Sequence, residues 1–256
     1  MLPFIIDVQE RYKQQTKIDM PNLTIPTHDG KSFNSYISFP KNLGEGEAAP
    51  CVIMIQEIFG VNKVMRDKCD WLADHGFIAC APDLFHQFEA GIELNDQIPD
   101  ELQRAFDYFG KFDIDQGIED IKATKHVLRG HAQSNGKVGA VGYCLGGKLA
   151  YLTSCHSDID CSIGYYGVGI EGILAQANTI SSPLMLHIAQ KDGFVPPDAQ
   201  KQIHNALQNN PNIRLHSYAD VGHAFAREGG DHYDEKASDL ANERTLSFLT
   251  QHLKGC

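Results

Sequence analysis

The sequence predicts an α/β protein whose mostly parallel sheet is covered by helices on both faces. Apolar runs with the character of buried strands alternate along the chain with stretches of helical pattern, which is typical of this class. Residues 137–150 add a buried strand, a glycine-bounded turn and the start of a helix in direct succession. The chain has 256 residues and no composition break, so we expect a single domain over residues 20–256.

The elements follow in order from an N-terminal extension, which we expect at residues 1–19. Alternating runs around Asp29-Gly30 predict a hairpin, and the continuous apolar run 51–56 predicts a strand buried on both faces. The segment 85–112 contains Pro99 and several polar residues, and we interpret it as an irregular, lid-like excursion near the ligand. The remaining predicted elements are helix 64–75, strand 77–81, helix 115–129, strand 137–142, helix 145–154, strands 161–166 and 184–189, helix 199–207, strand 213–218 and helix 235–253.

The composition excludes several classes of partner. A formal net charge of -11 argues against nucleic acid and against anionic membrane surfaces, both of which require basic patches. No apolar run reaches the length of a membrane span, and the first twelve residues lack the basic region of a signal peptide. The seven cysteines are odd in number, which disfavours a disulfide framework and fits a reducing cytoplasm. We expect a monomer or a small homo-oligomer.

The central motif is Gly142-x-Cys144-x-Gly146, which has the spacing of a nucleophile elbow with cysteine in place of serine. Small flanking residues let strand and helix approach closely, and a helix N-terminus stabilises a thiolate. The same stretch fits a phosphate-binding loop up to Lys148, but Leu149 stands where that loop needs a hydroxyl for magnesium. An inert buried cysteine in a glycine-rich turn is the remaining alternative.

Two polar residues that follow predicted strands are the expected partners of Cys144. Asp192 comes after the strand 184–189, and His223 comes after the strand 213–218. Ligands of a parallel sheet lie beyond the carboxyl ends of its strands, and the order nucleophile, acid, histidine is the one that α/β-hydrolases use. We therefore predict that His223 is the base and that Asp192 orients it, with Asp220 as a less favoured acid.

The loop after the first buried strand is the expected source of one oxyanion-hole donor. The backbone N–H groups of Ile58 and Leu145 would form that hole. Glu57 is unusual there, because a carboxylate beside an oxyanion repels the developing charge unless it is neutral or turned aside. The histidines form no zinc-type spacing, so we predict no metal and no cofactor.

From about residue 20 onward, the chain resembles the dienelactone hydrolase (carboxymethylenebutenolidase) family. The likeness rests on several motifs in the right order, which are Gln56-Glu-Ile-Phe-Gly-Val-Asn62, Pro82-Asp-Leu84, Ser134-Asn-Gly-Lys-Val138, Val141-Gly-Tyr-Cys-Leu-Gly-Gly147, Gly164-Tyr-Tyr-Gly-Val-Gly169, Asp192-Gly-Phe-Val-Pro196 and Gly222-His-Ala-Phe-Ala-Arg227. The resemblance implies an α/β-hydrolase fold, a Cys144–Asp192–His223 triad, and a Glu57 that holds the thiol inactive until substrate displaces it. It also implies that a carboxylated enol-lactone is opened to maleylacetate.

Two arginines hold the substrate carboxylate in the family that the chain resembles. Arg227 matches one of them, and its place four residues after His223 puts a planar donor fork on the rim of the same site. Arg104 is the best candidate for the other. The sequence thus predicts a carboxylic ester hydrolase that acts on a small lactone through a Cys144 thioester. The alternatives are action on another ester or thioester, a thiol redox protein that uses Cys144, and a binding module without catalysis.

Overall fold

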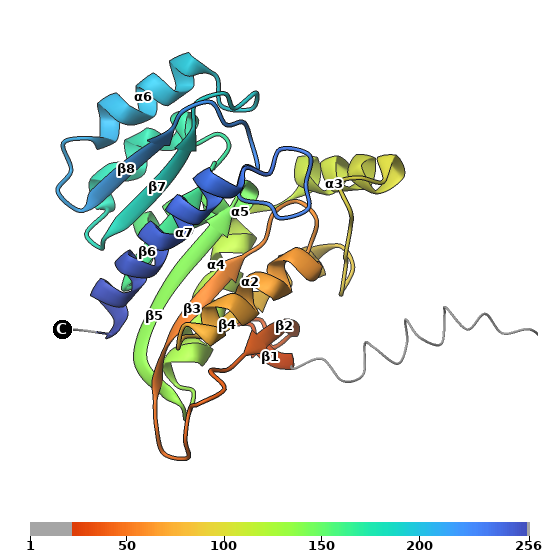
Figure 1. Cartoon of the computed structure of the whole chain (residues 1–256). Coiled ribbons are helices and arrows are strands. Elements are labelled where there is room, and N and C mark those ends of the chain that lie inside the picture. The colour runs from red at the N-terminus through yellow and green to blue at the C-terminus, as the bar shows by residue number, and fades with distance from the viewer. Residues whose placement is uncertain (1–21, 255–256) are drawn as a thin grey trace, which may run out of the picture.

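The computed structural model describes residues 22–254 and contains one sheet that all its strands join (Figure 1). The strand order is β1-β2-β4-β3-β5-β6-β7-β8. The strands are β1 (Asn22–Pro26), β2 (Ser32–Ser38), β3 (Ala49–Ile55), β4 (Ile78–Pro82), β5 (Ser134–Tyr143), β6 (Cys161–Tyr165), β7 (Leu184–Ala189) and β8 (Ile213–Tyr218). Pairings that involve β2 are antiparallel and all the others are parallel. The predicted hairpin and the mostly parallel sheet are confirmed, whereas the extension expected at 1–19 lies outside the described residues.

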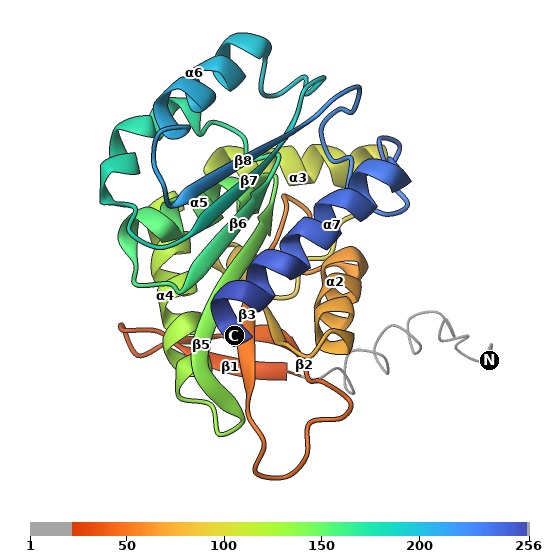
Figure 2. The same ribbon diagram turned by 60° about the vertical axis from the view of Figure 1, so that its left-hand side comes forward.

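Helices cover the sheet on both faces, as predicted (Figure 2). On one face lie α2 (Lys63–Asp74) and α7 (Glu235–Leu249), which a π-turn at Thr250–Lys254 continues. On the other lie α4 (Ile114–Arg129), α5 (Leu145–His156) and α6 (Pro197–Leu207), with the 3₁₀ segment Glu171–Thr179 beside them. No described helix is long and apolar enough to cross a membrane.

The segment 85–112 is more regular than the sequence suggested. It contains a short 3₁₀ helix at Leu84–Gln87 and the helix α3 (Pro99–Lys111), which we interpreted as irregular because of Pro99. Pro99 occupies the first turn of α3, where a missing N–H costs nothing because the first turn has no intrahelical acceptor. Helix α3 lies beyond the carboxyl ends of the central strands (Figure 1).

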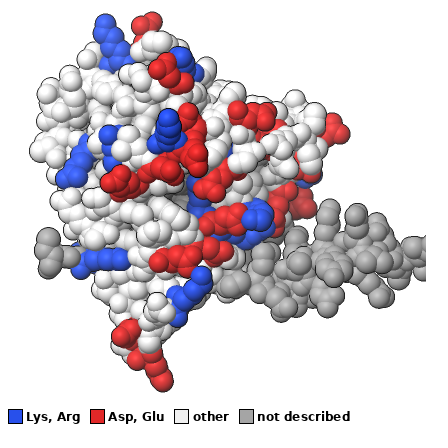
Figure 3. All heavy atoms as spheres, viewed as in Figure 1, with Lys and Arg blue, Asp and Glu red and all other residues white. Residues whose placement is uncertain are grey.

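The charge of the chain is spread over its surface. On the face drawn in Figure 3, acidic side chains form several groups with basic side chains scattered among them. The described part of this face therefore presents no continuous basic patch.

The core beneath α4 provides a test of this packing. Leu128 of α4 is fully buried, so Leu128→Ala should lower the free energy of unfolding by about 2–5 kcal/mol through lost burial and a residual cavity. Leu240 of α7 is exposed, and Leu240→Ala should change stability by less than about 0.5 kcal/mol. Chemical denaturation monitored by circular dichroism measures both. Equal effects would show that α4 does not pack on the sheet as described.

Candidate active site

Cys144 lies at the junction between β5 and α5 in a strained backbone conformation. Its φ is 55° and its ψ is -113°, which is uncommon for a residue with a side chain. The N–H of Cys144 donates to the carbonyl of Tyr165 at 3.0 Å, and its own carbonyl accepts from the N–H of Gly147 at 3.0 Å. Such a conformation costs about 1–3 kcal/mol and persists only where neighbours enforce it, most often at functional sites.

The two glycines of the motif allow the strand and the helix to touch. A Cβ atom on Gly142 would lie 1.9 Å from the carbonyl oxygen of Gly146. A Cβ atom on Gly146 would lie 2.3 Å from the carbonyl oxygen of Ile55, at the end of β3. No side chain fits at either place, so the backbone contact that tilts Cys144 out of the strand requires both glycines.

His223 and Asp192 meet beside this turn, at the ends of β8 and β7. The His223 Nδ1–H donates to Asp192 Oδ2 at 2.8 Å, and both side chains are buried. The other oxygen of Asp192 accepts the Phe194 N–H at 2.8 Å, which fixes the carboxylate. Asp220, the less favoured acid, is exposed and pairs instead with Lys191 at 2.7 Å. Asp192 is therefore the residue that orients the imidazole.

The surroundings of His223 favour its protonated form. Burial alone lowers the pKa of His223, but hydrogen bonds to Asp192 and Cys144, and their negative charge, raise this pKa to about 10. The imidazole is thus a cation at neutral pH and can balance a thiolate. Because the pKa is raised on folding, the stability that it contributes is complete below pH 6.5 and is lost as the pH rises to about 10.

The Glu57 carboxylate is held by Arg227. Its carboxylate accepts from Arg227 Nε at 2.8 Å and from Arg227 Nη2 at 3.1 Å, and Arg227 Nη1 donates to Asp96 at 2.7 Å. Among the described residues, the hydrogen bonds of the Glu57 carboxylate go to Arg227 alone. The guanidinium also stacks on the ring of Phe59, with 4.7 Å between its carbon and the ring centroid. The bidentate pair neutralises the charge of Glu57 that would repel an oxyanion.

A cavity of about 520 Å³ brings most of these groups together. Cys144, His223, Arg227 and Ile58 line it, and so do several apolar side chains, which are Leu102, Phe106, Phe109, Val168 and Phe194. Leu145 occupies the first position of α5, where its N–H has no intrahelical partner. Among the described residues, no group of three or more His, Cys, Asp or Glu side chains could hold a metal ion.

Arg104 does not join the other predicted residues. It is exposed on α3, donates to Tyr108 Oη at 3.2 Å, and is absent from the cavity lining. The sequence reasoning also missed Asp96 and the apolar wall of α3. The spacing of Leu102, Phe106 and Phe109 is that of one helix face, which would have revealed the wall had α3 been predicted. No sequence signal pointed to Asp96, which is brought to Arg227 by a loop.

Comparisons with known proteins show the family and the fold of the chain. The sequence model of the Dienelactone hydrolase family matches residues 33–253. A putative carboxymethylenebutenolidase of Azospirillum brasilense is 41% identical over 238 residues, with 91% of this chain and 100% of the relative covered. The carboxymethylenebutenolidase of Pseudomonas putida is 37% identical over 227 residues, with 89% and 94% covered. The solved structure of a putative dienelactone hydrolase from Klebsiella pneumoniae has a TM-score of 0.79 and 26% identity, covering 90% of this chain and 97% of that one. The predicted α/β-hydrolase fold is confirmed.

The raised pKa of His223 provides a test of the site. Asp192→Asn should bring this pKa below about 10, because the carboxylate that favours the imidazolium is lost and burial then dominates. Titration of the imidazole ring protons by NMR measures the change. Asp220→Asn is the matched control, since that carboxylate pairs with Lys191, and the His223 titration should keep its midpoint. A midpoint that stays at about 10 in Asp192→Asn would contradict the assigned partner.

Proposed function

Because the chain belongs to the dienelactone hydrolase family, we propose that Cys144, His223 and Asp192 are the catalytic triad of a lactone-opening enzyme. Relatives named carboxymethylenebutenolidase make the chain a carboxylic ester hydrolase of the dienelactone type. The observation that carries the triad is a strained cysteine at a helix N-terminus, beside a buried His–Asp pair, in one cavity. The substrate that we propose is a small enol-lactone with a carboxylate, opened to a product of the maleylacetate type.

Acylation begins with the thiolate of Cys144, paired with the protonated His223. The sulfur attacks the lactone carbonyl, and the N–H groups of Ile58 and Leu145 bind the oxyanion. When this intermediate collapses, the ring C–O bond breaks and the leaving enol oxygen takes the proton of His223. The acyl group then remains on Cys144 as a thioester, and His223 is neutral.

Deacylation restores the resting ion pair. Neutral His223 takes a proton from water as the water oxygen bonds to the thioester carbon. The C–S bond breaks, the acid leaves, and Cys144 is again a thiolate beside a protonated His223. The cycle consumes one water and breaks one ester bond. Asp192 keeps its hydrogen bond to Nδ1 throughout, so that Nε2 faces the reaction.

Arg227 and Glu57 supply substrate binding and thiol control in this proposal. Arg227 lines the cavity and offers a charged donor to the substrate carboxylate. Glu57 regulates the thiol, since its carboxylate is held on Arg227 and is freed when a substrate engages the arginine. This role is supported by the bidentate pair, which compensates the charge of the Glu57 carboxylate.

A second candidate function is the hydrolysis of small uncharged esters by the same triad. The apolar wall formed by Leu102, Phe106 and Phe109 favours this alternative, because it gives an aryl or alkyl group a surface to bury. Relative values of kcat/KM for carboxylated lactones and neutral aryl esters distinguish the two functions.

A redox role for Cys144 has less support. All six cysteines that the structure describes are free. Cys155, the nearest candidate for a resolving thiol along the chain, lies in the last turn of the same helix, about 16 Å away at the usual rise per residue. That distance exceeds what a disulfide spans without unfolding α5. A cytoplasmic location stays a prediction from the cysteine content, and a monomer or small homo-oligomer also stays a prediction.

Removal of the thiol tests the proposed nucleophile. Cys144→Ala should abolish lactone and aryl ester hydrolysis, because no other group can form the thioester. Steady-state kinetics measures the loss, and circular dichroism checks that the fold persists. Cys155→Ala, which removes a buried thiol from the same helix, should keep wild-type turnover and serves as the control. Retained hydrolysis by Cys144→Ala would exclude Cys144 as the nucleophile.

A further inference from the structure

We propose that Asp96 competes with the substrate carboxylate for Arg227 and so sets the preference of the site between charged and uncharged lactones. This inference rests on the proposed function, in which Arg227 binds a carboxylate. It starts from the ion pair of Arg227 Nη1 with Asp96 at 2.7 Å, inside the cavity that contains Cys144. Asp96 therefore already occupies part of the arginine that a charged substrate needs.

The carboxylates that pair with Arg227 outnumber it. Nε and Nη2 donate to Glu57 and Nη1 donates to Asp96, so three of the five guanidinium N–H groups have acceptors. Two carboxylates against one guanidinium give this group of side chains a net charge of about -1. A third carboxylate on the same guanidinium would be repelled by these two, and the departure of either one relieves that repulsion.

Asp96 is the carboxylate that can leave at the lower cost. The Glu57 side chain is 3% exposed and accepts two hydrogen bonds from Arg227, so its release would strand a buried charge. The Asp96 side chain is 25% exposed and accepts one hydrogen bond, and it can turn into water when it is displaced. A substrate carboxylate therefore exchanges with Asp96 before it disturbs the Glu57 pair.

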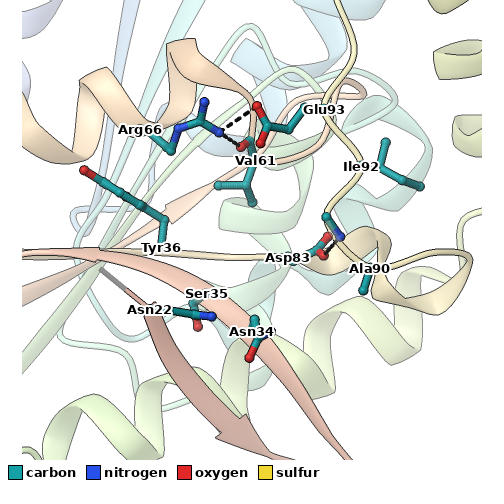
Figure 4. A pocket seen from close by; sticks show the side chains of 11 residues that line it. Asn22, Asn34, Ser35, Tyr36, Val61, Arg66, Asp83, Ala90, Ile92 and Glu93 are labelled. Atoms are coloured by element: carbon teal, nitrogen blue, oxygen red, sulfur yellow. Dashed lines mark hydrogen bonds and ion pairs between the residues drawn. The ribbon is translucent and has the colours of Figure 1, made fainter. Parts of the chain in front are cut away.

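Asp96 lies in the loop between Gln87 and Pro99, and the first part of this loop is anchored by two contacts. Figure 4 shows the Asp83 carboxylate turned to this loop, where it accepts the Gly91 N–H at 2.7 Å. In the same view Arg66 reaches Glu93, at 2.8 Å. The first contact ties the loop to the carboxyl end of β4, and the second ties it to α2.

The same loop is also tied to the backbone on either side of the cavity. The Leu94 N–H donates to the Phe59 carbonyl at 2.9 Å, and Gln97 Nε2 donates to the Gly229 carbonyl at 2.7 Å. Asp96 lies between these two ties and is held beside Arg227 before any ligand arrives. Because the loop is already fixed, the Asp96–Arg227 ion pair costs little further side-chain entropy and persists in the free protein. A substrate carboxylate can displace Asp96 if the Asp96 side chain alone rotates.

The test compares a carboxylated lactone with the uncharged lactone that lacks only this group. Asp96→Asn keeps the shape and removes the charge, so the ratio of kcat/KM for carboxymethylenebutenolide to that for methylenebutenolide should rise by about 10-fold, mainly through a lower KM. Asp231→Asn is the matched control, because Asp231 lines the same cavity without a described contact to Arg227. It should change the ratio by less than about 2-fold.

A second readout does not depend on lactone turnover. Benzoate should inhibit aryl ester hydrolysis about 10-fold more strongly in Asp96→Asn and in Asp96→Ser than in the wild type. An unchanged ratio and unchanged inhibition, or equal effects in Asp231→Asn, would overturn the competition. An equal loss on both lactones would also overturn it, because Asp96 would then only hold the loop. The proposed function would instead be refuted if the wild-type protein hydrolysed neither lactones nor aryl esters, or if Cys144→Ala kept full hydrolysis.

Discussion

The contact between the end of β5 and the start of α5 is the constraint on which the site depends. Gly142 and Gly146 meet there at a distance that admits no side chain, and Cys144 between them takes a positive φ. This strain lifts the thiol out of the strand and places it at a helix N-terminus. The parallel order of β5, β6, β7 and β8 then brings the residues after β7 and β8 to the same edge, where Asp192 and His223 meet.

Charge compensation is the second constraint, because the site buries several ionisable groups. His223 is held as a cation by Asp192 and Cys144, and Glu57 is neutralised by Arg227. Each buried charge has a partner, as the cost of desolvation requires. The Arg227 group carries one carboxylate more than this balance requires. The additional carboxylate is that of Asp96. Stabilisation of Glu57 does not require it, and in our proposal it sets the preference for charged or uncharged substrates.

The sequence predicted the sheet and the elbow because their signals are local. Continuous apolar runs mark buried strands, and the spacing of Gly142, Cys144 and Gly146 marks the turn whatever surrounds it. The positions of Asp192 and His223 followed from strand ends alone. Helix α3 was missed because Pro99 was taken as a breaker, although proline is favoured in a first turn. Asp96 could not be found, because its contact with Arg227 joins a loop to a residue 131 positions away. The placement of Arg104 failed for a related reason: the direction of a side chain on α3 depends on how that helix packs.

In the proposed mechanism, turnover passes through an acyl group on Cys144. The most direct measurement is mass spectrometry of peptides from enzyme that is mixed with an aryl ester and quenched in acid within the first turnovers. We expect the peptide that contains Cys144 to gain the mass of the acyl group, while the peptide that contains Cys155 keeps its mass. Turnover with no acyl group on Cys144, under quench conditions that preserve a reference thioester, would contradict the account.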